Sequence, residues 1–187
     1  MSAADLVIRN ARVRGQSGLV DIEVAKTRIT AVGAHLPGGV AAELDAAGGL
    51  VSPGFANLHL HADKALLGER MRPNVSGTRP QAIEITNDFK RTYDPEEVAK
   101  RAGRVLEEGV QNGTTFFRLF ADVGTIGGLR AAQGLLRARE QFRDLCRIQV
   151  VAFPQEGILR DPGAADLLDA AIIPSPIVAG ACHAAYV

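Results

Sequence analysis

The segment LVSPGFANLHLHADKAL, residues 50–66, decides the fold class of this 187-residue chain. Its apolar first part predicts a buried strand over residues 50–60. His59 and His61 lie at the end of that strand, although the whole chain contains only four histidines. Residues i and i+2 of a strand point to the same side, so we expect both imidazoles to project together.

The residues alone leave two interpretations of the histidine pair. Zinc and iron accept imidazole nitrogen, and ligands bind at the carboxyl ends of strands in parallel sheets and barrels. The pair is therefore a candidate metal site. The alternative is two structural histidines that are hydrogen-bonded at a loop. A buried apolar strand tolerates two polar rings only where they have partners, which favours the metal site.

The sequence on either side of this segment predicts a small β-rich module followed by alternating strands and helices. Strands are expected at 5–10, 19–25 and 28–33, with turns at 35–39 and 45–49. Further strands are expected at 114–121, 147–153 and 176–181, with helices from residue 95, over about 126–143 and over 161–171. Alternation of this kind predicts a parallel sheet with helices outside it.

The helix that begins after Asp94 has the clearest start and stop signals. Asp94 is the expected N-cap, Pro95 the first helical residue, and Glu97 completes a box-like cap. Apolar or small residues recur at helical spacing and form one face, namely Val98, Ala102, Val105, Leu106 and Gly109. The dipeptide at 112–113, Asn-Gly, is expected to end the helix.

Three stretches carry a resemblance to a known family. The first is residues 50–66, the second is VVAFPQEGIL at 150–159, and the third, which matches more loosely, is EEGVQNGTTFFRLFADVGT at 107–125. With these motifs the chain resembles the amidohydrolase superfamily, and within it the cytosine deaminase-like branch. The His-x-His after Pro-Gly-Phe marks the superfamily, and AFPQEG is the more specific signal for the branch.

The resemblance implies a fold and a chemistry. The fold is α/β: residues 1–52 are part of a composite β-sandwich, and residues 53–187 are the first half of a (β/α)8 TIM-like barrel, about four βα units. One divalent ion, Fe2+ or Zn2+, activates water that hydrolyses a C–N bond of a cytosine-like N-heterocycle. His59 and His61 match two metal ligands. Gln155 matches a glutamine that holds the substrate ring, and its amide offers a donor and an acceptor.

Other polar residues near these motifs have less specific interpretations. Lys64 is interpreted as a loop charge, because the bridging lysine of two-metal amidohydrolases lies on the fourth strand and this chain has no lysine after Lys100. Asp63 either orients a ligand histidine or is a solvated loop carboxylate. Arg118 and Asp122 are expected to form a structural ion pair. Glu156 is not assigned as the general base, and His35 and His183 are expected at the surface and in a loop, respectively.

The family pattern is incomplete in this sequence. A (β/α)8 barrel typically needs about 250 residues, many more than the 53–187 region offers. The resemblance places the third ligand histidine, the acid/base glutamate and a metal-binding aspartate on later strands, which have no counterpart here. We therefore expect the isolated chain to be inactive. Two alternatives remain: association with a second copy or a complementing C-terminal half, and a metal-binding module without hydrolase chemistry.

The charge balance and the distribution of apolar residues indicate which classes of partner to expect. Lys+Arg and Asp+Glu balance at 21 each, and 47% of the residues are apolar, as is ordinary for a globular protein. There is no basic run, so no nucleic-acid partner is expected. No stretch approaches the ~20 apolar residues of a membrane span, so we expect no membrane partner and a cytoplasmic location. Cys146 and Cys182 fit no metal or redox spacing and are expected to be buried, reduced thiols.

Overall fold

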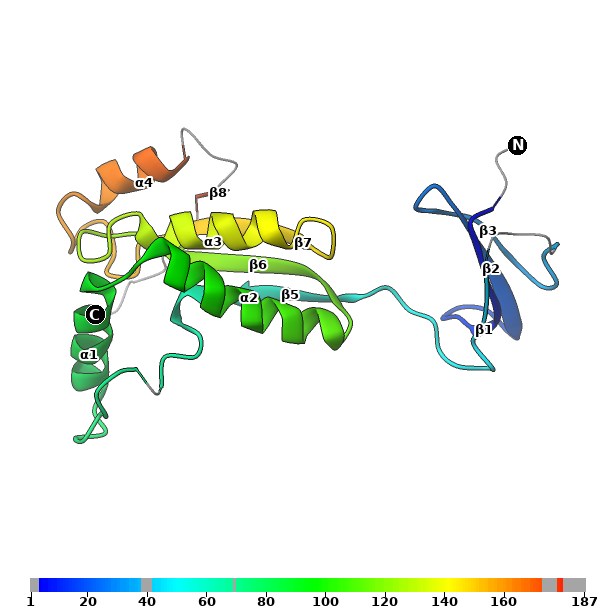
Figure 1. Ribbon diagram of the computed structural model, residues 1–187, viewed down its shortest axis with the longest axis horizontal. Coiled ribbons are helices and arrows are strands. Elements are labelled where there is room, and N and C mark those ends of the chain that lie inside the picture. The colour runs from blue at the N-terminus through cyan, green and yellow to red at the C-terminus, as the bar shows by residue number, and fades with distance from the viewer. Residues whose placement is uncertain (1–3, 38–41, 69, 173–177, 180–187) are drawn as a thin grey trace. The chain divides into compact units, whose positions relative to one another are not determined.

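A computed structural model describes residues 4–37, 42–68, 70–172 and 178–179. The chain divides into two compact units, Met1–Pro53 (unit 1) and Gly54–Val187 (unit 2), and Figure 1 traces the elements of each. The predicted strand at 176–181 coincides with only two described residues, and His183 and Cys182 lie outside the described part of the chain.

Unit 1 is a four-stranded sheet with the strand order β3-β2-β1-β4. Its strands are β1 (Leu6–Arg12), β2 (Leu19–Ala25), β3 (Arg28–Gly33) and β4 (Glu43–Asp45). β2 pairs antiparallel with β1 and β3, and β4 pairs parallel with β1. The three strands predicted here are confirmed. Val7 and Ile22 are both buried but point to opposite faces of the sheet, because Val7 pairs with Glu23, the residue next to Ile22 in β2.

One arginine links three strands of unit 1. The Arg9 guanidinium forms ion pairs with Asp21 at 2.7 Å and with Glu43 at 2.8 Å. Arg9 also donates to the backbone carbonyl of Leu36. Its hydrogen bonds hold the pKa values of the Asp21 and Glu43 carboxyls below their usual range.

Unit 2 is built around a parallel sheet with the order β5-β6-β7-β8, as the alternating pattern predicts. The strands are β5 (Phe55–Leu60), β6 (Thr114–Asp122), β7 (Arg147–Phe153) and β8 (Val178–Ala179). The helices are a short 3-10 turn η1 (Ala62–Lys64), α1 (Arg79–Arg91), α2 (Pro95–Gln111), α3 (Arg130–Gln141) and α4 (Ala164–Ile172).

The core of unit 2 lies between the sheet and helices α2 and α3, which run side by side along it (Figure 1). Alternate residues of β6, among them Phe117 and Leu119, are buried in this core together with Leu106 of α2 and Leu135 of α3. The intervening residues of β6, such as Phe120, lie on the other face of the sheet, since side chains alternate along a strand. That other face carries the histidine pair.

The start of α2 shows which parts of the predicted cap are right. Asp94 is the N-cap, and its side chain accepts a hydrogen bond from the backbone N–H of Glu96. Glu97 does not complete a capping box, because its carboxylate pairs instead with Arg101, one turn along the helix, and with Arg70. The apolar face of the helix is confirmed by the complete burial of Val98, Ala102 and Leu106.

Three expected element boundaries in unit 2 need correction, and one helix was missed. The strand predicted over 50–60 begins at Phe55 and is not buried, because β5 lies at an edge of the described sheet; Phe55 is 67% exposed and Leu58 55% exposed. The helix predicted over 126–143 is confined to α3, because a turn closed by Gly124 and Gly128 precedes it. Helix α4 begins later than expected, since the Asp161 carboxylate binds Thr125 instead. Helix α1 was not predicted.

Candidate functional site

The site is assembled where three parallel strands end. β5 ends at Leu60 and β6 at Asp122, and β7 is followed closely by Gln155 and Glu156. Because the strands are parallel and adjacent, their carboxyl ends meet at one edge of the sheet. Polar residues that are far apart in the sequence are therefore brought together.

His59 and His61 converge at this edge. The two Nε2 atoms lie 3.3 Å apart. The His59 ring stacks on Phe120 with a centroid distance of 4.2 Å, and the His61 ring meets the edge of Phe153 at 5.4 Å. Aromatic contacts from β6 and β7 therefore hold both rings in place.

The geometry of the pair fits two positions around a divalent ion. Two imidazole nitrogens at about 2.1 Å from a tetrahedral zinc ion are about 3.4 Å apart, close to the separation found here. Burial lowers the pKa of His61 to about 4, with Lys64 and His59 adding to the shift, so the ring is neutral at neutral pH and keeps a lone pair for a metal. Among the described residues, no three His, Cys, Asp or Glu side chains group closely enough to complete a metal site.

Asp63 is fully buried beside the pair, so the interpretation as a solvated loop carboxylate is wrong. Its Oδ2 accepts a hydrogen bond from the backbone N–H of Asp122. Its Oδ1 lies 4.0 Å from His61 Nδ1, and within the described part of the chain both atoms lack a hydrogen-bond partner. Burial raises the pKa of the carboxyl to about 6. Asp63 is thus placed to take a hydrogen bond from His61 when Nδ1 carries the proton.

Two lysines, Lys64 and Lys90, form ion pairs with the carboxylate of Asp122. Lys64 pairs with Asp122 at 2.8 Å and donates to Gln155 Oε1 at 2.9 Å, so its interpretation as a loop charge is wrong. Lys90, which is 1% exposed, pairs with the same Asp122 at 3.1 Å and also with Glu156. These four charges neutralise one another in pairs, as a buried ionic cluster requires.

The expected ion pair between Arg118 and Asp122 is absent from the described contacts. Arg118 donates to Gln149 Oε1 on β7, and Asp122 is taken by the two lysines. Residues four apart in a strand point to the same side but lie about 13 Å from each other, which separates these two side chains.

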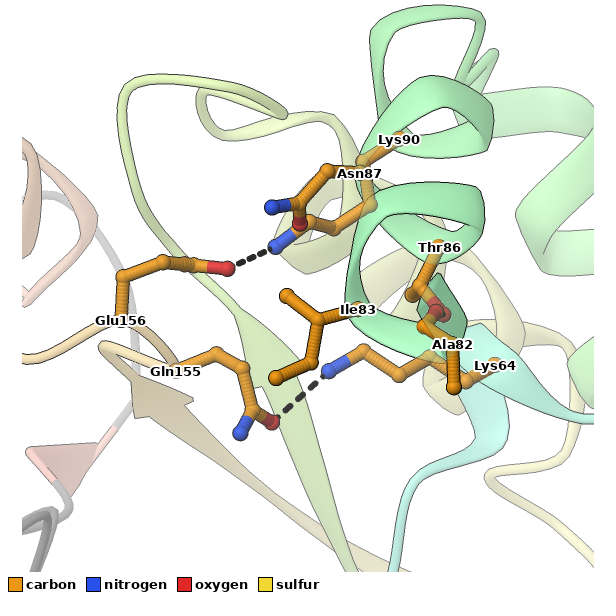
Figure 2. Close-up of a pocket in the computed structure, with 8 residues that line it drawn as sticks. All are labelled: Lys64, Ala82, Ile83, Thr86, Asn87, Lys90, Gln155 and Glu156. Carbon is orange, nitrogen blue, oxygen red and sulfur yellow. Dashed lines mark hydrogen bonds and ion pairs between the residues drawn. The ribbon is translucent and has the colours of Figure 1, made fainter. Parts of the chain in front are cut away.

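A pocket of about 250 Å³ opens next to the lysines (Figure 2). Lys64, Gln155 and Glu156 form one part of its lining, and α1 supplies the rest, including Ile83 and Asn87. Neither histidine lines the pocket, and its link to the pair is Lys64, whose charge helps to lower the pKa of His61.

Comparisons with known proteins agree with this architecture. The chain is 37% identical over 161 residues to N-isopropylammelide isopropyl amidohydrolase from Pseudomonas sp. (strain ADP), covering 84% of this chain and 40% of that protein. It is 31% identical to pterin deaminase from Rhizobium rhizogenes, covering 71% of this chain and 31% of the relative. The solved structure of 5-methylcytosine deaminase from Klebsiella pneumoniae matches with a TM-score of 0.83 and 33% identity, covering 93% of this chain and 42% of that one. No family model matches.

The chain belongs to the amidohydrolase superfamily. It corresponds to the N-terminal portion of these relatives and spans about two fifths of the length of the first of them. The resemblance read from the sequence motifs is therefore confirmed at the level of the superfamily and its cytosine deaminase-like branch. None of the helices that the structure describes combines the length and apolar character that a membrane crossing requires.

Sequence reasoning missed the contribution of α1 to the candidate site. Its polar composition gave no strong helical period, and only Ile85 and Phe89, spaced i and i+4, signalled a buried face. Lys90 follows Phe89 directly and was not singled out, although a charged residue next to such a face is a candidate for a buried ion pair. His35 is exposed, as expected, and Cys146 is only half-buried.

Proposed function

We propose that this chain is the N-terminal portion of a metal-dependent amidohydrolase that hydrolyses a C–N bond of an N-heterocycle. In this proposal His59 and His61 hold one Fe2+ or Zn2+ ion, and Gln155 holds the ring. The relatives support the reaction class, since by name they act on an N-substituted ammelide, a pterin and 5-methylcytosine. Unit 1 would be part of a composite β-sandwich and unit 2 the first half of a (β/α)8 barrel.

The observation that carries the proposal is the 3.3 Å separation between the two Nε2 atoms at the carboxyl edge of the sheet. When bound, the metal supplies Lewis-acid chemistry by lowering the pKa of a coordinated water. Phe120 and Phe153 hold the imidazole rings of the two histidines in position. Asp63 is placed to accept a hydrogen bond from the protonated Nδ1 of His61.

Metal binding by the 187-residue chain tests the assignment. Isothermal titration with Zn2+ should show one ion per chain, and His59→Ala or His61→Ala should each abolish that binding, because neither ring alone forms a chelate. His35→Ala is the matched control, since His35 is an exposed turn residue of unit 1. Zinc binding that survives the loss of both His59 and His61 would refute the assignment.

We expect the isolated chain to have no turnover, because catalytic zinc sites usually have three protein ligands and the described residues offer two. The measurement is release of ammonia from cytosine, or of isopropylamine from N-isopropylammelide, with added Zn2+ or Fe2+. Metal-dependent release that disappears in His61→Ala would show that the chain is a complete catalyst and that this expectation is wrong.

A second candidate function is association through the exposed edge of the sheet. β5 has one neighbour in the described sheet, and Leu58 on it is 55% exposed, so this edge offers unpaired backbone and apolar surface to a second copy or a complementing C-terminal half. Sedimentation velocity should then show self-association that Leu58→Lys reduces. Leu159→Lys, at a residue 93% exposed outside the strands, should leave it unchanged. A monomer at all concentrations would contradict self-association.

A further inference from the structure

The pocket is small, and its lining combines polar and apolar side chains from η1, from α1 and from the segment after β7. Gln155 and Glu156 enter it from the segment after β7, and Ile83 and Asn87 enter it from α1 (Figure 2). Its volume of about 250 Å³ is below the roughly 300–1,000 Å³ of pockets that hold drug-sized ligands. A single planar ring with small substituents suits a pocket of this size.

Lys64 decides which end of the Gln155 amide faces a ligand. Its ammonium donates to Gln155 Oε1 at 2.9 Å, which uses one of the two acceptor positions of the carbonyl oxygen and leaves both amide N–H donors available. The Gln155 amide thus has two donors but one remaining acceptor position to offer to a ring. A ring that meets this amide should present an acceptor, such as an oxo group.

Asn87 is the pocket-lining side chain of α1 with free hydrogen-bonding capacity. Thr86 donates its hydroxyl hydrogen to the backbone carbonyl of Ala82, and the Lys90 ammonium is held by two carboxylates. The Asn87 amide makes no hydrogen bond to any residue that the structure describes, and it points into the pocket (Figure 2). A half-buried amide without protein partners is suited to binding a polar ligand group.

We propose that Asn87 is a specificity-determining residue that contacts a second polar substituent of the ring held by Gln155. The ligand class is a monocyclic heterocycle with an oxo group toward Gln155 and a further oxo or amino group toward α1. This inference rests on the proposed function, because it takes the pocket to be the ring subsite beside the metal ligands. Ile83 supplies an apolar contact for the ring, and Lys64 acts as a positioning residue for Gln155.

Two probes distinguish this role from a general effect on the pocket. Cyanuric acid carries oxo groups on all sides and can reach both amides, whereas 2-pyridone carries one oxo group and can satisfy only Gln155. Binding to the metal-free 187-residue chain is measured by titration with two-dimensional NMR. Asn87→Ala should weaken cyanuric acid binding about five- to tenfold, the loss of one hydrogen bond, and leave 2-pyridone affinity within about twofold.

Matched variants complete the test. Gln155→Ala should weaken both probes, and Glu84→Ala, an exposed change on the same helix, should affect neither. The proposal is overturned if Asn87→Ala weakens both probes equally, if it weakens neither, or if cyanuric acid shows no saturable binding. Zinc titration of the same variants separates the two proposals: a chain that binds cyanuric acid through Asn87 but no zinc refutes the metal assignment and leaves this one standing.

Discussion

Gly134 in α3 lies in close contact with α2, and replacing it tests the packing of unit 2. A Cβ atom at this position would lie 2.6 Å from the Cβ and Cγ1 atoms of Val98 and 2.8 Å from the backbone oxygen of Pro95. Real Cβ atoms essentially never approach other atoms this closely. Because one of the opposing atoms belongs to the backbone, rotation of a side chain cannot relieve the clash, and the helices have to move apart.

Two opposing effects set how much Gly134→Ala changes the free energy of unfolding. Alanine is favoured over glycine in a helix interior by about 1 kcal/mol. Overpacking a well-filled core costs about 1–3 kcal/mol, and a contact with backbone falls toward the upper end of that range. We therefore expect the free energy of unfolding to fall by about 1–2 kcal/mol.

Gly103 in α2 is the matched control. A Cβ atom there would lie 3.4 Å from Phe142 Cε2, which is an ordinary contact, so Gly103→Ala should keep the helix-propensity gain of up to about 1 kcal/mol. Urea unfolding followed by far-UV circular dichroism reports on unit 2, since the described helices all belong to it. With a slope of about 2 kcal/mol per molar urea, the two midpoints should differ by about 1 M. Equal stabilisation by both substitutions would refute the tight packing.

Two further predictions concern charged groups. Arg9 holds the pKa values of Asp21 and Glu43 below their usual range, so at acidic pH the unfolded chain binds more protons than the folded chain. The Arg9 ion pairs therefore contribute their full stability to unit 1 above the unfolded pKa values of about 4. That contribution falls as the pH drops through the folded pKa values of the two carboxyls. Protection factors from amide hydrogen exchange in unit 1 should fall over this pH range, and Asp21→Asn should make the fall smaller. Protection factors that do not change with pH would contradict this prediction. Lys90→Met removes the buried ammonium that pairs with Asp122 and Glu156, and it should lower the free energy of unfolding of unit 2 by about 3 kcal/mol. Lys100→Met, at an exposed position of α2, is the control and should change that free energy by less than about 0.5 kcal/mol. Equal urea midpoints for the two lysine variants would rule out the buried ion pairs.

The parts of the fold that could be predicted are those with local signals. Asp94 and Pro95 mark the start of α2 by themselves, because capping depends on residues within one turn. The strand over 114–121 was recognisable from its β-forming side chains, and the spacing of His59 and His61 placed both rings on one side. Each of these inferences needs only the geometry of a single element.

The parts that could not be predicted depend on which elements become neighbours. The sequence favours a loop charge for Lys64, yet its partners are Asp122, at the end of the next strand, and Gln155, after the strand beyond that. The buried position of Asp63 likewise follows from the backbone N–H of Asp122. The alternation of strands and helices predicts the parallel sheet but not the pairing of side chains at the strand ends.

Helix α1 explains why those pairings form as they do. It brings the Lys90 ammonium to Asp122 and Glu156 at the strand ends, and the carboxylate of Glu156 supplies the second negative charge that balances the two ammonium groups around Asp122. Lys64 then remains close enough to hold Gln155, which orients the amide toward the pocket. Helix α1 thus connects the charge balance of the site to the orientation of Gln155, the proposed ring-binding residue. Substitutions of Lys90 should therefore alter the pocket as well as the stability of unit 2.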